Sequence, residues 1–203
     1  MTDENVDRNI PFYNVILKCD NYKNSEIILK LGYRFKNYEL GDENSWAKLE
    51  YEIGDFDSVN EAKEYFIDNY CKNKEIRKRC FFVLNSENEI VGSCTAWKDK
   101  KDNENVASLH WLVVSPKERN KGLGKALCQK VLNFFHEENE FPVYIHTQPW
   151  SYKAILLYIN LGFKIQISDT FSNYENEYTE AMKTLNNILP KEQYEKLRIN
   201  SEK

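Results

Sequence analysis

The segment that decides the fold reads Leu109-His110-Trp111-Leu112-Val113-Val114, then Ser115-Pro116, then Arg119-Asn120-Lys121-Gly122-Leu123-Gly124. Its first six residues form an apolar run closed by a serine and a proline, which predicts a buried strand. From Leu123 onward, apolar residues recur at helical spacing: Leu123, Ala126, Leu127, Val131, Phe134 and Phe135. The segment therefore predicts a strand, a tight turn and an amphipathic helix in direct succession.

The turn at residues 119–124, called the glycine turn below, has the features of an anion-binding site. The first N–H groups of a helix have no partner inside the helix, and the positive end of the helix dipole lies there. Gly122 and Gly124 let a phosphate approach the backbone, and Arg119 and Lys121 add positive charge. A dinucleotide fingerprint needs a third glycine, and a P-loop needs a hydroxyl where Ala126 stands, so both are excluded.

Two motifs resemble those of the GNAT N-acetyltransferase superfamily. The segment from Val114 to Gly124 is similar to the family's Q/R-x-x-G-x-G/A, which follows a strand ending in Val-x-Pro. The segment from Ser151 to Phe163 is similar to N-x-x-A-x-x-L-Y-x-x-x-G-F, with serine in place of the first asparagine. The resemblance covers residues 33–167 and is loose before Arg79.

The resemblance implies an α/β (α+β) fold. We expect a single GNAT-like domain with a mixed central sheet, splayed parallel strands and flanking helices. The expected boundaries are an N-terminal tail at 1–11, the acyl-CoA-dependent N-acetyltransferase domain at 12–168, and a helical C-terminal extension at 169–203.

The patterns predict strands at 12–17, 32–38, 80–84, 90–97, 142–147 and 163–167. They predict helices at 46–53, after Ser58, at 151–161, at 174–188 and after Pro190. Residues 98–105 are predicted to be a polar loop. Whether the family's last strand is lost, moved or hidden in 169–173 stays open.

Composition narrows the class of protein. With 203 residues, 41% hydrophobic and 14% aromatic, the chain can bury a sizeable core. The net charge of −4 argues against non-specific nucleic-acid binding, and no apolar run approaches the ~20 residues of a membrane span. Five cysteines without a C-x-x-C pair favour reduced thiols and a cytoplasmic location. The histidines lack metal-site spacing, so we expect no metal. We expect a monomer or homodimer.

The resemblance implies acetyl-CoA (coenzyme A) as co-substrate. Its pyrophosphate would bind the glycine turn, and its pantetheine arm would pair with the preceding strand as an extra strand does. The residues expected to bind it are Leu112, Val113, Val114, Arg119, Asn120, Lys121, Gly122, Leu123, Gly124, Lys125 and Ser151. Ser151 can equally be the N-cap of the following helix.

Two catalytic residues are expected, Tyr158 and His110. By its place in the second motif, Tyr158 is assigned as the proton donor to the leaving thiolate; the alternative is a core tyrosine.

His110 matches the histidine of arylalkylamine N-acetyltransferases and would take the amine proton through water. Histone acetyltransferases instead carry a glutamate at the place of Ser108. Alternation would put Ser108, His110, Leu112 and Val114 on one face. The alternative is a structural histidine. His146 is a weaker candidate, and His136 is expected to be solvated.

The implied function is acyl transfer, in the EC 2.3.1 class. The chain would transfer acetyl from acetyl-CoA to a primary amine of a small molecule by direct attack in a ternary complex. The acceptor would enter over the early helices, where Trp46, Tyr51 and Phe56 stand among carboxylates that suit a cation. The alternative is a non-catalytic acyl-CoA-binding sensor or partner subunit, because Ser108 supplies no acidic base.

Overall fold

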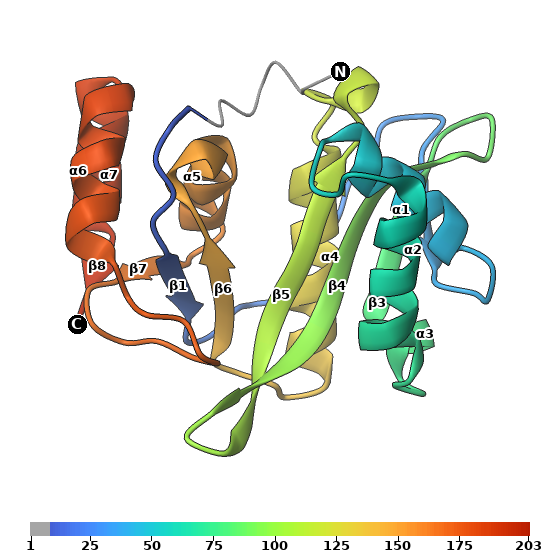
Figure 1. The fold of residues 1–203 in the computed structure, drawn as a ribbon, viewed down its shortest axis with the longest axis horizontal. Coiled ribbons are helices and arrows are strands. Elements are labelled where there is room, and N and C mark those ends of the chain that lie inside the picture. Colours follow the sequence, from blue (N-terminus) through green and yellow to red (C-terminus); the bar gives the residue numbers. More distant parts are fainter. Residues whose placement is uncertain (1–8) are drawn as a thin grey trace. The chain divides into compact units, whose positions relative to one another are not determined.

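A computed structural model describes residues 9–203, so most of the predicted tail at 1–11 lies outside the described residues (Figure 1). The strands are β1 (Val15–Cys19), β2 (Arg34–Asn37), β3 (Cys80–Leu84), β4 (Ile90–Lys101), β5 (Glu104–Val114), β6 (Val143–Thr147), β7 (Lys164–Gln166) and β8 (Ser201–Glu202). The helices are α1 (Glu43–Glu52), α2 (Val59–Phe66), α3 (Ile76–Arg79), α4 (Leu123–Glu137), α5 (Tyr152–Asn160), α6 (Tyr178–Ile188) and α7 (Lys191–Ile199). Short helical turns are η1 (Ile67–Cys71, π-helical), η2 (Pro116–Glu118) and η3 (Pro149–Ser151), the last two 3-10 turns.

The described chain forms two compact units, and β4 and β5 each run from one into the other. Unit one comprises 24–97 and 109–134, and unit two comprises 9–23, 98–108 and 135–203. In unit one the strand order is β2-β3-β4-β5, with antiparallel pairing from β2 to β4. In unit two the order is β4-β5-β6-β1-β7-β8, in which β5–β6 and β7–β8 are parallel and β6–β1 and β1–β7 antiparallel. This mixed eight-stranded sheet with flanking helices confirms the expected fold class.

An aromatic core packs helices α1 and α2 of unit one. Trp46 on α1 is fully buried, with its ring 4.8 Å from that of Phe66 on α2. The start of α2 is fixed by Ser58, its N-cap: the Glu61 N–H donates to Ser58 Oγ at 3.1 Å, and the Glu61 carboxylate accepts the N–H of Asp57, the residue before the N-cap, at 3.1 Å. This arrangement confirms the predicted helix after Ser58.

The prediction of a loop at 98–105 is wrong. Strand β4 continues to Lys101, and β5 begins at Glu104. The turn between them uses Asp102 and Asn103, both at positive φ (51° and 68°), which suits a tight two-residue hairpin. The prediction rested on the polar composition of residues 98–105. A hairpin whose side chains alternate between exposed and half-buried positions needs few apolar residues, so a polar segment can still form paired strands.

The C-terminal extension supplies the strand that the sequence left open. Helices α6 and α7 are followed by β8, which pairs in parallel with β7 (Figure 1). The N–H of Ile165 donates to the Asn200 carbonyl at 2.9 Å, and that of Ile167 donates to the Glu202 carbonyl at 2.8 Å. A parallel return needs a long connection, and the two helices provide it.

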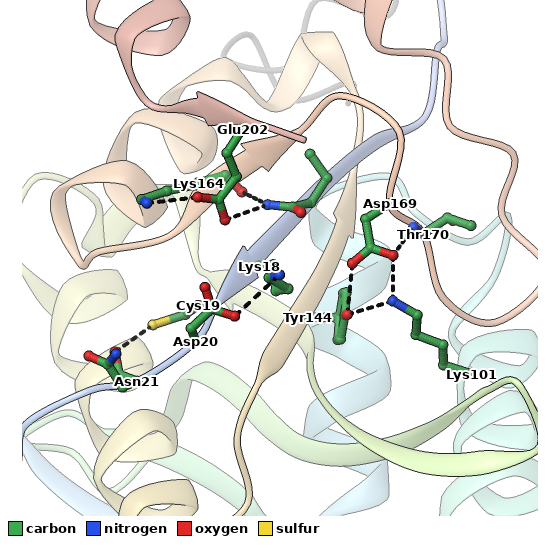
Figure 2. A network of polar contacts seen from close by, with 11 residues as sticks. Lys18, Cys19, Asp20, Asn21, Lys101, Tyr144, Lys164, Asp169, Thr170 and Glu202 are labelled. Atoms are coloured by element: carbon green, nitrogen blue, oxygen red, sulfur yellow. Dashed lines mark hydrogen bonds and ion pairs between the residues drawn. The ribbon is translucent and has the colours of Figure 1, made fainter.

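A triangle of polar groups ties three segments of unit two together (Figure 2). Lys101 Nζ donates to Tyr144 Oη at 2.8 Å and forms an ion pair with Asp169, while Tyr144 Oη donates to Asp169 Oδ2 at 2.9 Å. Burial raises the pKa of Asp169, but the bonds from Lys101 and Tyr144 outweigh burial and hold this pKa below its usual value. Each member has a partner, so the triangle is structural.

Candidate functional site

The glycine turn of unit one has open space beside its backbone. Gly122 lies at φ 84°, and an ideal Cβ built on it would meet no heavy atom within 4 Å. The N–H of Ala126 donates to the Gly122 carbonyl at 3.0 Å, one turn into α4. The N–H groups of Leu123, Gly124 and Lys125 precede that bond, where a helix offers its amides no internal acceptor. An anion at this point would meet free space, amide donors and the positive end of the α4 dipole.

The charges around the turn are already partly engaged. Lys121 Nζ lies 2.6 Å from Glu118 Oε2 and 2.9 Å from Tyr33 Oη, and Tyr33 also donates to Glu118. Hydrogen bonds from Lys121 and Tyr33 hold the pKa of Glu118 below its usual value. Lys121 therefore supplies less net charge to a ligand than its presence in the sequence suggests. Lys125 is exposed, and Arg119 is half-buried.

Strand β5 leads into the turn through a fixed exit. Val113 is buried, and Leu112 and Val114 are half-buried. The Ser115 N–H donates to the Val91 carbonyl at 2.9 Å, and Ser115 Oγ donates to Glu52 Oε2 at 2.9 Å. These two bonds hold the end of the strand and thereby set where the glycine turn begins.

A glycine on β4 allows close packing beside the same strand. A Cβ at Gly92 would lie 3.0 Å from Leu127 Cδ1 on α4 and 3.2 Å from the Val113 carbonyl oxygen. Contacts this short leave almost no room for a side chain at this position. The absence of a Cβ at Gly92 thus helps to set the position of α4.

The backbone of β5 breaks its alternation at Trp111. This residue has φ 51°, which is rare for a bulky side chain and strained within a strand. Tyr70 Oη in η1 lies 3.0 Å from His110 Nδ1 and accepts from Trp111 Nε1 at 2.7 Å. Two consecutive side chains thus reach one hydroxyl, so the expected strict alternation through His110, Leu112 and Val114 is wrong.

The other candidates for a base have structural partners. In unit two, Ser108 is fully buried and donates from Oγ to Asp99 Oδ2 at 2.6 Å. His146 stacks on Tyr174 with ring centroids 3.7 Å apart, and its Nε2 lies 2.8 Å from Asn14 Oδ1. His136 is exposed at the end of α4, as expected.

The residues of the second motif lie in unit two. Tyr158 on α5 is 5% exposed, with its ring 5.9 Å from that of Phe163. Ser151 precedes α5 but makes no side-chain capping bond; its Oγ accepts from Gln148 Nε2 at 3.0 Å instead. Ser151 is thus the N-cap residue of α5 by position, as the alternative expected, but its side chain does not cap the helix.

The aromatic residues of α1 and of the segment after it do not all face an open acceptor site, as the sequence had predicted for Trp46, Tyr51 and Phe56. Trp46 is 0% exposed and belongs to the core, so its face is not open to a cationic acceptor. Phe56 is half-buried and stacks on Trp111, with centroids 5.6 Å apart and an interplanar angle of 26°. Tyr51 is 49% exposed.

Two residues of unit one were not singled out by the sequence. Tyr70 is not among the predicted site residues, and its hydrogen bond to His110 spans 40 positions that no local pattern relates. Glu50 is fully buried, and both carboxylate oxygens are without a hydrogen-bond partner among the described residues. Burial, with a smaller contribution from the charge of Asp55, raises the pKa of Glu50 well above its usual value. Glu50 lies one helical turn after the buried Trp46, and this spacing was the feature of the sequence that could have indicated its burial.

Among residues 9–203, no group of three or more histidine, cysteine or carboxylate side chains is placed to hold a metal ion. None of the described helices combines the length and apolar character needed to cross a membrane.

The fold and the glycine turn together define a mixed α/β protein in which an open glycine turn leads directly into the N-terminus of a helix. Comparison with protein families agrees: the model of the acetyltransferase (GNAT) family matches residues 44–163. This match spans more than half of the chain, and the chain belongs to the GNAT family of acetyltransferases.

Individual relatives are similar over part of their length. Mouse N-acetyltransferase 8B is 30% identical over 102 residues, which is 49% of this chain and 44% of that protein. The chain thus spans about half the length of the curated relatives it matches. A GCN5-related N-acetyltransferase from Sphaerobacter thermophilus superposes with a TM-score of 0.60 at 17% identity, over 76% of this chain and 49% of that one. A GNAT-family acetyltransferase from Colwellia psychrerythraea gives 0.58 at 14% identity, over 76% and 54%. These two likenesses concern the fold.

Proposed function

We propose that this chain transfers the acetyl group of acetyl-CoA to a primary amine of a small molecule, by direct attack in a ternary complex. Membership of the GNAT family supports acetyl transfer. The observation that carries the proposal is the open space at Gly122 beside the first amides of α4. A doubly negative pyrophosphate fits that space because amide donors and the helix dipole both favour anions.

The pantetheine arm would then lie along Leu112, Val113 and Val114. It carries two amides, which can bond with strand backbone as an added strand does. Arg119, Asn120, Lys121, Leu123, Gly124, Lys125 and Ser151 remain proposed cofactor contacts. For Asn120 and Lys121 the backbone, rather than the side chain, is expected to matter, since Lys121 is engaged with Glu118.

Two side chains are assigned to proton transfer. Tyr158 is proposed to donate a proton to the sulfur of coenzyme A as the thioester breaks, because a phenol of pKa about 10 can protonate a thiolate whose acid has a pKa of about 8.5. His110 is proposed to accept the proton that the amine loses on forming the amide. The five unpaired cysteines, four of them buried, support a cytoplasmic location as part of the proposal.

The test is thiol release from acetyl-CoA across a panel of amines, with the wild type beside Tyr158→Phe. Loss of turnover in Tyr158→Phe, with acetyl-CoA affinity intact, is the expected result. Identical turnover in both proteins would remove Tyr158 from the mechanism. His110→Ala is measured in the same assay, and an unchanged rate would make His110 a structural residue.

A second candidate function is a non-catalytic acyl-CoA-binding module. It is favoured by Ser108, which supplies no acidic base and whose hydroxyl is bound to Asp99. This candidate predicts acetyl-CoA binding without acyl transfer to any amine of the panel or to protein lysines. Acyl transfer to any one of these acceptors excludes it.

A further inference from the structure

In unit one, the hydroxyl of Tyr70 lies within hydrogen-bonding distance of two side chains, those of His110 and Trp111. Tyr70 lies in the π-helical turn η1 that follows α2, and such turns occur often at functional sites. It is 3% exposed, and its ring packs edge-on against Trp97 with centroids 4.6 Å apart. The position of its hydroxyl is therefore set by packing, not by solvent.

The strained backbone at Trp111 brings both strand residues to this hydroxyl. In a regular strand His110 and Trp111 would point to opposite faces. With φ 51° at Trp111, the indole Nε1 and His110 Nδ1 lie 2.7 Å and 3.0 Å from Tyr70 Oη. A conformation that costs about 1–3 kcal/mol persists only where its surroundings stabilise it, and this hydrogen-bonded cluster is one such source.

The indole of Trp111 sets the direction of one hydrogen bond in this cluster. An indole N–H can only donate, so the Tyr70 oxygen accepts from Trp111. The direction of the bond between the Tyr70 hydroxyl and His110 Nδ1 depends on the tautomer of His110. Where the hydroxyl donates, its proton occupies the lone pair of Nδ1, and a neutral ring carries its own proton on Nε2.

We infer that the Tyr70 hydroxyl donates to His110 Nδ1: it fixes the ring orientation and tautomer, and it relays a proton to that nitrogen. This role rests on the proposed function, in which His110 receives the proton of the acceptor amine. The proton path is balanced. The Tyr70 O–H bond breaks as Nδ1–H forms, and the Tyr70 oxygen regains a proton that an intervening water has taken from the amine. The histidine ends as the imidazolium, and Tyr70 remains neutral.

The first test reads the tautomer of His110 and needs no activity. The chain has three histidines, so ¹⁵N-histidine labelling gives a simple spectrum, assigned with His136→Gln and His146→Gln. At a pH where the ring is neutral, the wild type should show an unprotonated Nδ1 and a protonated Nε2, and Tyr70→Phe should show a mixture. An unprotonated Nε2, or a tautomer mixture in the wild type, would overturn the inference.

The second test separates a role in catalysis from a role in folding. Tyr70→Phe should lower kcat by about 10- to 100-fold, because Tyr70 acts through His110 and its loss costs less than the roughly 10²- to 10⁴-fold of a general acid or base itself, with the KM for acetyl-CoA changed less than about twofold. Tyr194→Phe, which removes a phenol hydroxyl from α7, is the matched control and should keep the wild-type kcat. An unchanged kcat in Tyr70→Phe contradicts the inference. Absence of turnover in the wild type contradicts the proposed function instead, and the tautomer measurement then decides about Tyr70 alone.

Discussion

Gly122 and Trp111 both adopt positive φ, for different physical reasons. Gly122 has no Cβ, so the conformation costs little and leaves the turn open to a ligand. Trp111 carries a bulky side chain, and its strain is opposed by the bond from its indole to Tyr70. A glycine in a motif can be recognised from the sequence, whereas a strained tryptophan cannot, because the groups that hold it lie far away in the chain.

Substitution of Gly122 by alanine should weaken acetyl-CoA binding. The added Cβ meets no protein atom, but it occupies the space beside the amides, and loss of one charge-assisted bond of about 1.5–3 kcal/mol corresponds to a roughly 10- to 150-fold higher Kd. Calorimetric titration of acetyl-CoA measures this.

Gly41→Ala is the matched control, since Gly41 also has a positive φ (105°) and open space for a Cβ. Both variants should lose about 1–2 kcal/mol of stability through backbone strain. Equal acetyl-CoA affinity in the two variants would remove the glycine turn from the binding site.

Glu50→Gln should stabilise the protein increasingly as the pH rises. Burial raises the pKa of Glu50, so the folded state keeps this group neutral after the unfolded chain, with a pKa of about 4.3, has ionised it. Its contribution to stability is therefore complete below about pH 4.3 and is lost as the pH rises toward the folded pKa, by about 1.4 kcal/mol per pH unit. Urea unfolding of both proteins between pH 4 and 8 measures the difference, and a difference that does not change with pH would show that Glu50 is ionised in the folded state.

At the scale of secondary-structure elements, β8 stabilises an edge that would otherwise be exposed. Strand β7 has three residues and pairs with β1 on one side and β8 on the other. An unpaired strand edge presents free N–H and C=O groups that invite association with other chains. The last residues of the chain thus complete the sheet of unit two, although they are not part of either motif.

Removal of residues 200–203 should destabilise the chain by about 1–3 kcal/mol and increase its tendency to aggregate. The N–H groups of Ile165 and Ile167 lose their acceptors at Asn200 and Glu202, and each bond contributes about 0.5–1.5 kcal/mol. Urea unfolding and light scattering measure the two effects. Glu202→Gln keeps the backbone bonds and removes only the charge facing Lys164, so its effect should be smaller. A loss in Glu202→Gln as large as in the truncation would assign the stability to the ion pair.

At the scale of the whole molecule, the net charge of the chain does not favour binding of the proposed cofactor. The chain carries −4, and acetyl-CoA is also an anion. In the proposed complex, binding would therefore depend on local groups, for which the candidates are the amides at the start of α4 and the side chains of Arg119 and Lys125. The family match at residues 44–163 includes all of these groups.

Acetyl-CoA should raise the melting temperature of the chain. A ligand that binds only the folded state adds about 2.7 kcal/mol at 100 times its Kd, which is about 5–10 °C for a chain of this size. Thermal denaturation with and without acetyl-CoA measures the shift. S-acetylpantetheine at the same concentration, which lacks the pyrophosphate, should give a smaller shift. An equal shift from both compounds would place the main binding energy away from the glycine turn.

The sequence by itself determined the features that depend on local backbone chemistry. These are the strand, turn and helix around Gly122, the N-cap at Ser58 and the family. Each rests on residues a few positions apart, whose propensities and hydrogen bonds act within one turn. The cofactor-binding and catalytic residues stay predictions.

Only the tertiary structure decided what depends on distant partners. Tyr70 meets His110 across 40 positions, Lys121 is engaged by Tyr33 across 88, and β8 finds β7 after two intervening helices. The burial of Glu50 was likewise set by packing against other segments. Contacts of this kind form when burial brings remote segments together, and no spacing along the chain encodes them.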